Sequence, residues 1–461
     1  MPNARILAID LGTTRCKAGV VDSAGEILSM ASRELRLGRP DRGLVESSER
    51  AWRSTVFSCS REALREAAAK RVAMVSVTAQ TATPVCFDEA NRPVGPVISH
   101  LDTRAATQFQ RATETFPDSY VASKLMGNLG WIKDREPEAF SRIATVCDVA
   151  EYVGRLLTGI ATHDGAWLPK KRTKLLTELL GMKESAFGVE HDNSTPIGEV
   201  TRSAAESSGL QPGTPVLIAP FDGMSGVVGS GLVRPNVAAE VAGTTEVVAA
   251  VTRKDLSTTN HAIPGLQLFY TSPPLGLPYD WFRRTLYGGG RSEEQYASIE
   301  REVASIPAGP SAMLFVPGFS NANFSWKING RLFGMEFEGD RSDVLKAVME
   351  GVTMSVRTIV DHLKDEGVVI QSVRISGGGS KSEAWNRIRA DVYGVPVELL
   401  QTSETGCLGS SVFAAASLGL YSTLKEASEA MVHVSSTYQP NPTRVKEYDR
   451  MYRRFKSASL H

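Results

Sequence analysis

The chain of 461 residues is too long for one ordinary domain of about 150 residues, so we expect two or three domains. Apolar residues make up 42% and charged residues 22% of the sequence, which is typical of a soluble globular protein. The 51 basic and 51 acidic side chains cancel. This balance predicts neither a nucleic-acid partner nor binding to an anionic membrane surface.

Cysteine usage and the N-terminal residues indicate where the protein acts. The five cysteines, at positions 16, 59, 86, 147 and 407, lack the paired spacing of a metal site, and their odd number favours reduced thiols. The first apolar run contains Asp10, which argues against a signal peptide. No apolar run approaches the roughly 18 residues of a membrane span. We therefore expect a cytoplasmic protein without a membrane segment.

The N-terminal residues predict a strand, a tight turn and two further strands. Residues 6–10 are apolar and end in Asp10, and the turn Gly12-Thr13-Thr14 precedes strands at residues 17–21 and 26–31. Glycine permits a tight turn, and the N–H groups and hydroxyls of such a turn can converge on an anion. A carboxylate beside a phosphate-sized turn can hold hydrated Mg²⁺, although an aspartate that only caps a turn is common.

Polar residues follow the next predicted strand and open a helix. Residues 74–78 form a strand pattern that leads to Gln80 and Thr81, and a helix start contains Asp102 and Arg104. Strand ends are the usual ligand-binding edge of an open α/β sheet, and these side chains suit a ligand rich in hydroxyl groups. A local ion pair or helix cap explains Asp102 and Arg104 equally well.

The middle of the N-terminal half combines helices with an irregular stretch. Residues 47–69 predict a helix with Ser48 as its N-cap, and residues 120–160 are mostly helical. Residues 165–215 are polar and irregular, with a short helix near residues 173–180.

One carboxylate, Asp222, stands out near the middle of the chain. It follows a predicted strand at residues 216–219 and precedes a glycine, so little shields it from a ligand. The segment 223–232 is rich in glycine and serine and predicts close packing against a neighbour. The polar, proline-containing segment 233–236 predicts a domain boundary, which gives domains 1–235 and 236–461.

The second half begins with a repeat of the N-terminal pattern. Gly243-Thr244-Thr245 interrupts an apolar strand pattern at residues 239–251, as Gly12-Thr13-Thr14 does near the N-terminus. Two such turns favour two related halves that close on one polyphosphate, and two unrelated hairpins are the alternative.

Further along, residues 312–316 predict a strand and residues 317–330 a loop. Residues 342–364 predict a long helix with Ser342 as its N-cap.

A glycine loop then joins a strand to a helix. Residues 373–376 and 383–393 predict these two elements, with Gly377-Gly378-Gly379 after the strand. This geometry lets a backbone approach a nucleotide closely, although the spacing is neither a Walker loop nor a Rossmann fingerprint, and a plain tight turn is the alternative. After a strand at residues 397–400, the helix predicted at residues 406–418 has small residues on one face and should pack closely against another backbone.

Taken together, these stretches resemble the FGGY family of carbohydrate kinases, and its xylulokinases in particular, over nearly the whole chain. The main matching stretches are AIDLGTT (8–14), HLDTRA (100–105), LLTG (156–159), APFDGMSGVVGSG (219–231), AGTTEVV (242–248), ISGGGSKSEAWNRIRADVYGVPV (375–397) and TGCLGSSVFAAASLG (405–419). The resemblance implies an α/β fold of two ribonuclease-H-like domains of the actin-like ATPase superfamily, with a central cleft. Residues 1–235 would form the sugar-binding side, and residues 236–461 the side that binds ATP.

The resemblance also implies roles for individual residues and implies ATP and Mg²⁺ as cofactors. Asp222 corresponds to the catalytic base, which also touches the substrate, and Asp10 to the aspartate associated with Mg²⁺. Cofactor-binding positions are Thr13, Thr14, Gly243 and Thr244 at the phosphates and Gly378, Gly379 and Ser382 at the adenosine. Sugar-binding positions are Gln80, Thr81 and Asp102. A positioned carboxylate that accepts a hydroxyl proton typically accelerates such a reaction by ~10²–10⁴-fold.

Several residues depart from the family pattern, and they leave the substrate open. Thr81-Ala82-Thr83 stands where xylulokinases have Met-His-Gly, and His100 replaces the usual tryptophan. Ala79 stands where many relatives have glycine, and Asn321-Ala322-Asn323-Phe324 replaces a Glu-Arg-x-Pro type loop. The Arg-Glu pair of glycerol kinases is absent, which argues against glycerol.

We therefore expect an ATP-dependent kinase of a small sugar or polyol, with a ketopentose such as xylulose as the representative substrate. A four-carbon polyol and a sugar acid remain alternatives. A non-catalytic, ATP-binding regulatory relative and a chaperone-like or filament-forming ATPase are alternatives from other classes. A homodimer is left open.

Overall fold

The computed structural model describes residues 4–39, 41, 43–243, 246–254, 259–289, 292–322, 325–335 and 339–459. The chain divides into two compact units. Unit 1 contains residues 1–229 and 405–431, and unit 2 contains residues 230–404 and 432–461. By packing, residues 405–431 therefore group with the N-terminal part of the chain. The division into functional domains 1–235 and 236–461 stays a prediction.

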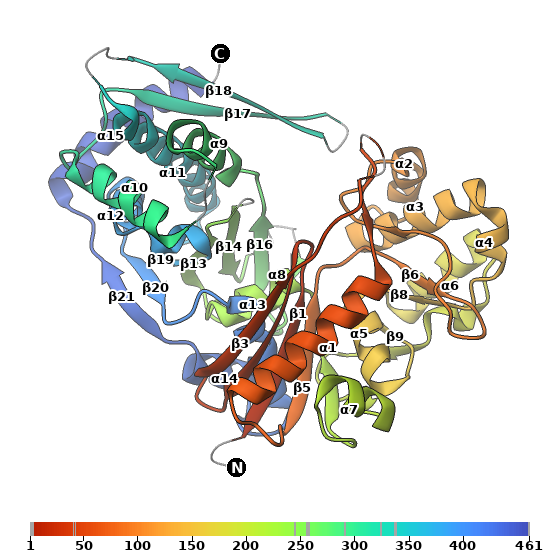
Figure 1. Cartoon of the computed structure of the whole chain (residues 1–461). Helices are drawn as coiled ribbons and strands as arrows, with labels where there is room; N and C mark the ends of the chain where they lie inside the picture. The colour runs from red at the N-terminus through yellow and green to blue at the C-terminus, as the bar shows by residue number, and fades with distance from the viewer. Residues whose placement is uncertain are drawn as a thin grey trace. The chain divides into compact units, whose positions relative to one another are not determined.

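Unit 1 is built on a six-stranded mixed sheet with the strand order β11-β12-β5-β1-β2-β3. Figure 1 labels its strands β1, β3 and β5. Its strands are β1 (Arg5–Leu11), β2 (Arg15–Asp22), β3 (Ile27–Glu34), β5 (Met74–Ala79), β11 (Gly198–Glu199) and β12 (Pro215–Ile218). Separate two-stranded pairs are β4 (Glu46–Ser47) with β7 (Val97–Ile98), β6 (Val85–Phe87) with β8 (Thr145–Cys147), and β9 (Thr162–Asp164) with β10 (Val189–His191).

The helices of unit 1 come from both of its chain segments. They are α1 (Glu49–Glu66), α2 (Ala106–Thr115), α3 (Tyr120–Arg135), α4 (Pro137–Ser141), α5 (Val149–Thr158), α6 (Lys170–Leu180), the 3₁₀ helix η1 (Glu184–Phe187), α7 (Arg202–Ser208), α8 (Asp222–Gly229), α13 (Thr405–Ser417) and α14 (Leu424–Met431). The predicted N-cap Ser48 is confirmed, because its hydroxyl accepts a hydrogen bond from the N–H of Ala51 at 3.3 Å.

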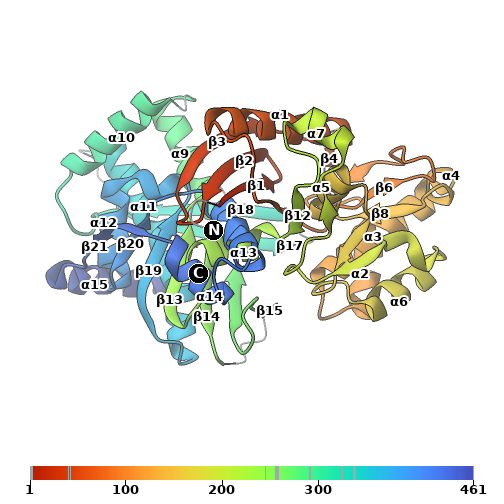
Figure 2. The same ribbon diagram turned by 90° about the horizontal axis from the view of Figure 1, so that it is seen from below.

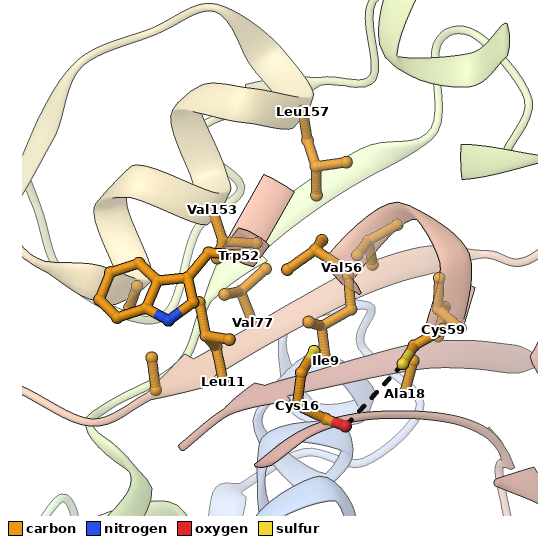
Figure 3. Packing of buried hydrophobic residues seen from close by; sticks show 14 of the residues in the cluster. Ile9, Leu11, Cys16, Ala18, Trp52, Val56, Cys59, Val77, Val153 and Leu157 are labelled. Atoms are coloured by element: carbon orange, nitrogen blue, oxygen red, sulfur yellow. Dashed lines mark hydrogen bonds between the residues drawn. The ribbon is translucent and has the colours of Figure 1, made fainter. Parts of the chain in front are cut away.

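Alternation along β1 gives the sheet two different faces. Ile9 and Leu11 point to the face covered by α1 and α5, where they pack with Trp52, Val56 and Val153 (Figure 3). Burial of each such side chain contributes roughly 1.5–3 kcal/mol. The intervening residues point to the opposite face, against which α13 packs (Figures 1 and 2). The predicted strand, turn and strand at the N-terminus are confirmed as the antiparallel pair β1–β2.

The helices α8 and α13 of unit 1 cross with their backbones in contact. A Cβ atom at Gly409 would overlap the carbonyl oxygen of Ser225, and one at Gly229 would overlap the carbonyl oxygen of Thr405. Only glycine fits at either position, since any side chain would push the helices apart. This crossing confirms the predicted close packing of both small-residue segments.

Unit 2 is built on a seven-stranded mixed sheet with the strand order β15-β16-β14-β13-β19-β20-β21. Its strands are β13 (Asn236–Val241), β14 (Val247–Thr252), β15 (Thr259–Asn260), β16 (Gln267–Thr271), β19 (Ile370–Ser376), β20 (Val397–Leu400) and β21 (Val434–Tyr438), and a separate hairpin consists of β17 (Leu314–Ala322) and β18 (Ser325–Phe333). Its helices are α9 (Gly276–Tyr287), α10 (Glu293–Ser305), α11 (Arg341–Asp365), the 3₁₀ helix η2 (Gly378–Lys381), α12 (Glu383–Tyr393) and α15 (Pro442–Ser459).

Two sequence-based predictions for unit 2 are wrong. Within the predicted loop at residues 317–330, residues 317–322 and 325–330 belong to the paired strands β17 and β18, because the backbone ladder holds polar and small residues in strands, and residues 323–324 lie outside the described residues. The N-cap of α11 is Asp340, not Ser342. Asp340 accepts hydrogen bonds from the N–H groups of Ser342 and Asp343, and the Asp343 side chain accepts one from the N–H of Asp340. This reciprocal capping box satisfies more terminal N–H groups than a serine cap would.

Within the part of the chain that the structure describes, no helix combines the length and apolar character needed to traverse a bilayer.

The helix crossing in unit 1 generates a stability prediction. We expect Gly409→Ala to lower the free energy of unfolding by about 1–3 kcal/mol or more, since the added methyl group overlaps backbone atoms. Urea unfolding followed by circular dichroism measures the change. Gly226→Ala is the matched control on α8, because its Cβ would lie 3.7 Å from Thr405 Oγ1, an ordinary contact. Helix propensity should leave the control as stable as the parent or stabilise it by up to about 1 kcal/mol. Equal stabilities of the two variants would contradict the overlap.

Candidate functional site

Three neighbouring parallel strands of unit 1 end at one edge of its sheet. The strands β1, β5 and β12 run parallel to one another, with β5 in the middle. Asp10 lies near the end of β1, Gln80 directly follows β5, and Asp222 follows β12 after three residues. The carboxyl ends of parallel strands form the usual ligand-binding edge of an α/β sheet. The structure thus brings together three of the residues singled out in the sequence.

Asp222 is the first residue of α8 and is half-buried. Its Oδ1 accepts a hydrogen bond from the N–H of Gly223 at 2.7 Å, which favours the carboxylate. Burial outweighs this bond and raises the pKa of Asp222 to about 7, with a further contribution from the negative charge of Asp10. At neutral pH this carboxyl group can therefore either hold or release a proton.

Asp10 faces the first turn of α13. A Cβ atom at Gly406 would lie 2.7 Å from Asp10 Oδ2, so the carboxylate lies directly against the glycine backbone. The N-terminus of a helix carries partial positive charge and stabilises an anion there. The absent side chain at Gly406 leaves room for the Asp10 carboxylate.

The loop after β5 is held by a buried carboxylate, Asp148, which is the N-cap of α5. Asp148 Oδ2 accepts hydrogen bonds from the Thr81 hydroxyl at 2.6 Å and the Ala82 N–H at 2.7 Å, and Oδ1 accepts one from the Thr83 N–H at 2.9 Å. Burial and the nearby Glu151 raise the pKa of Asp148 to about 6. Because the Thr81 hydroxyl donates to Asp148, Thr81 holds the loop in place, and its contact with a sugar stays a prediction.

Gln80 is oriented by the predicted phosphate turn. The Thr13 hydroxyl donates to Gln80 Oε1 at 2.7 Å, so the amide of Gln80 is fixed with Nε2 as its donor. Thr14, next to Thr13, is exposed. The Gln80 side chain is only 3% exposed, and Nε2 has no hydrogen-bond partner among the described residues. A buried donor without a partner is a good position for a ligand oxygen.

Asp102 forms the local ion pair that the sequence left open as one explanation. It is 1% exposed, and Arg104 Nη2 lies 2.8 Å from its Oδ2. The N–H of Val45 also donates to Oδ2, at 2.5 Å, and the N–H of Arg104 donates to Oδ1 at 2.8 Å. Nearby, burial and the charge of Lys124 lower the pKa of His100 to about 4. A direct contact of Asp102 with a sugar stays a prediction.

A cavity of about 30 Å³ in unit 1 is lined by Gln80 and by Phe221, the residue before Asp222. The polar residues that line it are Gln80, Thr81, Asp148, Glu151, Thr162, His163 and Asp164. Its apolar lining includes Trp167, whose ring meets that of Phe221 edge to face at 5.1 Å between centroids. The volume suffices for one or two waters or for the end of a small ligand.

Thr162 and His163 also line the cavity, and Thr162 Oγ1 and His163 Nε2 have no hydrogen-bond partner among the described residues, although His163 Nε2 lies 3.8 Å from Glu190 Oε2. Burial lowers the pKa of His163, so its ring is neutral at pH 7, and burial raises the pKa of Asp164. The cavity thus presents neutral and acidic groups, and the described residues that line it include no lysine or arginine.

Sequence patterns did not single out Asp148, His163, Asp164 or Trp167. The sequence predicts residues 120–160 as mostly helical, so no predicted helix start identifies Asp148 as the N-cap of α5. The other three lie on or just after β9, a three-residue strand that pairs with the distant β10. So short a strand has no readable hydrophobic period.

In unit 2, the predicted glycine loop follows β19 and lies against the end of β13. The N–H of Gly379 donates to the carbonyl of Ala242 at 3.0 Å, and Gly377 has a φ of 81°, which favours glycine. A Cβ atom at Gly378 would have nothing within 4 Å, so this position is open to a ligand. Gly243 directly follows Ala242, whereas Thr244 lies outside the described residues.

Ser382 is the N-cap of α12. Its Oγ accepts a hydrogen bond from the N–H of Trp385 at 3.1 Å and donates to Glu300 Oε2 at 2.6 Å. These contacts fix the start of α12, which follows the glycine loop. A contact of Ser382 with adenosine stays a prediction.

The raised pKa of Asp222 predicts how stability depends on pH. A carboxyl group whose pKa is higher in the folded state contributes stability that is present below the usual aspartate pKa of about 4 and is lost as pH rises to about 7. Asp222→Asn removes this loss. We therefore expect the variant to have a higher Tm than the parent at pH 8 and an equal one at pH 4, in buffer without Mg²⁺. A Tm difference that does not change between these pH values would contradict the pKa.

Comparison with known proteins agrees with the fold and the motifs. The model of the "FGGY family of carbohydrate kinases, N-terminal domain" matches residues 5–229, and that of the C-terminal domain matches residues 238–418. The chain is 24% identical to xylulose kinase of Bacillus subtilis (strain 168), over 99% of this chain and 97% of the relative. It is 26% identical to L-xylulose/3-keto-L-gulonate kinase of Escherichia coli (strain K12), over 97% of this chain and 95% of the relative.

A solved structure is also similar over nearly the whole length. The crystal structure of xylulose kinase from Rhodospirillum rubrum gives a TM-score of 0.83 at 25% identity, and the match covers 99% of this chain and 98% of that one. This likeness confirms the predicted fold class. Because the two domain matches together span most of the sequence, the chain belongs to the FGGY family of carbohydrate kinases.

Proposed function

We propose that this kinase transfers the terminal phosphoryl group of ATP to a hydroxyl group of a neutral sugar or polyol, with a ketopentose such as xylulose as the representative substrate. One observation carries the proposal. Asp222, with a pKa raised to about 7, directly follows Phe221, which lines a small cavity whose described lining includes acidic and neutral polar side chains but no lysine or arginine.

Asp222 is proposed as the general base. A sugar hydroxyl is a poor nucleophile, and a carboxylate that accepts its proton lowers the barrier to attack on phosphorus. A base works best when its pKa is near the working pH, because it is then deprotonated and still basic. The pKa of about 7 meets this condition, whereas an exposed aspartate with a pKa near 4 would be a weaker base.

The lining of the cavity favours a neutral substrate over a sugar acid. Gln80 Nε2 and Thr162 Oγ1 can pair with hydroxyl groups of the substrate end. Asp148 and Asp164 would repel a substrate carboxylate, and the described lining includes no lysine or arginine. Glu151 is paired with His191, whose Nε2 lies 3.3 Å from Glu151 Oε1. Like charges in a buried site are strongly unfavourable. We infer that a hydroxymethyl end fits here and a carboxylate end does not.

ATP and Mg²⁺ are proposed to bind through the glycine turns and Asp10. The open position at Gly378 suits close approach of adenosine, and Gly243 with Thr244 suits the phosphates. The mutual repulsion of Asp10 and Asp222 supports a cation near Asp10, since Mg²⁺ usually binds one or two carboxylates together with phosphate oxygens. When bound, Mg²⁺ neutralises charge on the phosphates.

We also propose that the enzyme acts in the cytoplasm. All five cysteines are buried and none forms a disulfide bond, as expected for a protein of a reducing compartment.

Turnover of ATP with a panel of acceptors tests the function. We expect activity with ketopentoses or other neutral polyols and little with matched sugar acids, because of the acidic lining. Asp222→Asn should lower kcat with the preferred acceptor by ~10²–10⁴-fold, roughly 3–5 kcal/mol in barrier, with near-normal ATP affinity.

The panel also separates the alternatives. Activity confined to sugar acids would reject the neutral substrate. ATP turnover that no acceptor stimulates would reject the kinase function. If Asp222→Asn keeps more than about a third of parental kcat while the chemical step is rate-limiting, Asp222 is not the base.

The nucleotide site has a separate test. Gly378→Val should fold normally, because the site has no neighbouring atoms within 4 Å, yet it should weaken ATP binding at least about tenfold by blocking adenosine. Isothermal titration with a non-hydrolysable ATP analogue measures the change. Gly289→Val is the matched control, since Gly289 in the same unit is equally open. Unchanged affinity in a folded Gly378→Val protein would reject the assignment.

A further inference from the structure

A buried arginine contacts the glycine loop of unit 2. Arg389, on α12, is fully buried, and its guanidinium carbon lies 4.4 Å from the centroid of the Trp385 ring. A buried arginine normally needs several partners, because removal of its charge from water is costly. Its partners therefore indicate what it holds.

These partners come from both elements that are proposed to contact ATP. Arg389 Nη1 donates to the carbonyl of Gly379 at 3.1 Å, inside the glycine loop. Arg389 Nε donates to Glu240 Oε1 at 2.7 Å on β13, and Nη2 pairs with Glu246 Oε1 at 3.6 Å just before β14. Glu240 and Glu246 thus lie on the two sides of the turn that contains Gly243. The single guanidinium group hydrogen-bonds the glycine loop and Glu240 before the turn, and it lies within ion-pair distance of Glu246 after the turn.

Asn386, one helical turn before Arg389, completes the arrangement. Its Oδ1 accepts a hydrogen bond from Arg389 Nη1 at 3.1 Å, and its Nδ2 donates to the carbonyl of Ser380 at 2.7 Å. Side chains of α12 therefore hydrogen-bond two consecutive carbonyl groups of the loop, those of residues 379 and 380. The strands β13 and β19, which lead into the turn and the loop, lie side by side (Figure 1).

Charge makes this cluster sensitive to substitution. Two buried carboxyl groups face one guanidinium group, and burial together with the charge of Glu240 raises the pKa of Glu246. The Tyr393 hydroxyl donates to Glu240 Oε2 at 2.6 Å. A buried ion pair is weak evidence of a contribution to stability, since desolvation offsets much of the attraction. Its directional bonds to loop carbonyls, by contrast, fix geometry.

We propose that Arg389, together with Asn386, is a positioning residue that fixes the loop of Gly378 and Gly379 against the turn of Gly243 in the geometry that binds ATP. The inference rests on the proposed nucleotide site. A guanidinium group donates from separate nitrogens in fixed directions, and a lysine ammonium, with one nitrogen on a flexible stem, does not reproduce the fork that reaches Glu240 and Gly379.

Steady-state kinetics of Arg389→Lys test the proposal. We expect KM for ATP to rise roughly tenfold, as for the loss of a hydrogen bond to a charged group, while kcat and KM for the sugar change less than about twofold. A purely structural arginine would lower Tm and leave KM for ATP unchanged, so that result would overturn the proposal.

Arg374→Lys is the matched control in the same unit. Arg374 Nε pairs with Glu398 at 3.0 Å and Nη1 donates to the carbonyl of Ser230 at 2.9 Å, but neither bond reaches the glycine loop. This variant should lower Tm without a change in KM for ATP. If both lysine variants raise KM for ATP equally, the effect is general and the proposal is wrong.

A second variant, Asn386→Ala, tests the proposal in case Arg389→Lys does not fold. If Arg389→Lys does not fold, Asn386→Ala leaves the ion pairs intact and frees the Ser380 carbonyl, and it should raise KM for ATP at least about threefold. Unchanged KM there would overturn the proposal. Gly378→Val, measured in parallel, separates the assignment of the nucleotide site from the positioning role of Arg389 and Asn386. If it leaves ATP affinity unchanged, the nucleotide site is misassigned. If it abolishes binding while Arg389→Lys and Asn386→Ala do not affect KM for ATP, only the positioning role fails.

Discussion

The candidate site of unit 1 depends on a contact between two helix backbones. The helix α8 begins with Asp222, and the first turn of α13 lies against Asp10. The two helices can approach so closely only because Gly229 and Gly409 lack side chains at their crossing. This packing constraint, several residues away from the carboxylates, therefore holds the start of α13 against Asp10 and supports the helix that begins with Asp222.

The grouping of carboxyl groups at this site is unfavourable for the stability of unit 1. Carboxyl groups lie together in a partly dehydrated environment, and the pKa values of Asp222 and Asp148 are raised as a result. Enzymes commonly place such groups where reactivity requires them and stabilise the fold elsewhere. In unit 1 that stabilisation comes from the apolar face of the sheet, where Trp52 and Val56 are buried against β1 (Figure 3).

Local sequence signals predicted much of the fold and part of the site. Glycine turns between apolar runs identified the β1–β2 hairpin, and strand ends identified Asp10, Gln80 and Asp222, because both signals lie within a few residues. Features that depend on distant partners could not be predicted. Residues 317–330 are rich in serine, asparagine and glycine, and strands β17 and β18 form there through their backbone ladder. The cap of α11 is decided by a reciprocal bond that Ser342 does not make. The cavity near Gln80 likewise requires strand pairings of short segments.

The discontinuity of unit 1 has a consequence for folding during synthesis. The ribosome releases residues 1–229 long before residues 405–431, although both belong to one packed unit. Until α13 emerges, the sheet face that carries Asp10 and the glycine face of α8 have no covering helix from this segment. Nascent chains fold largely in order of synthesis, so this part of the unit is completed late. The helix that lies against Asp10 and α8 is therefore made only after nearly nine-tenths of the chain, since α13 begins at residue 405 of 461.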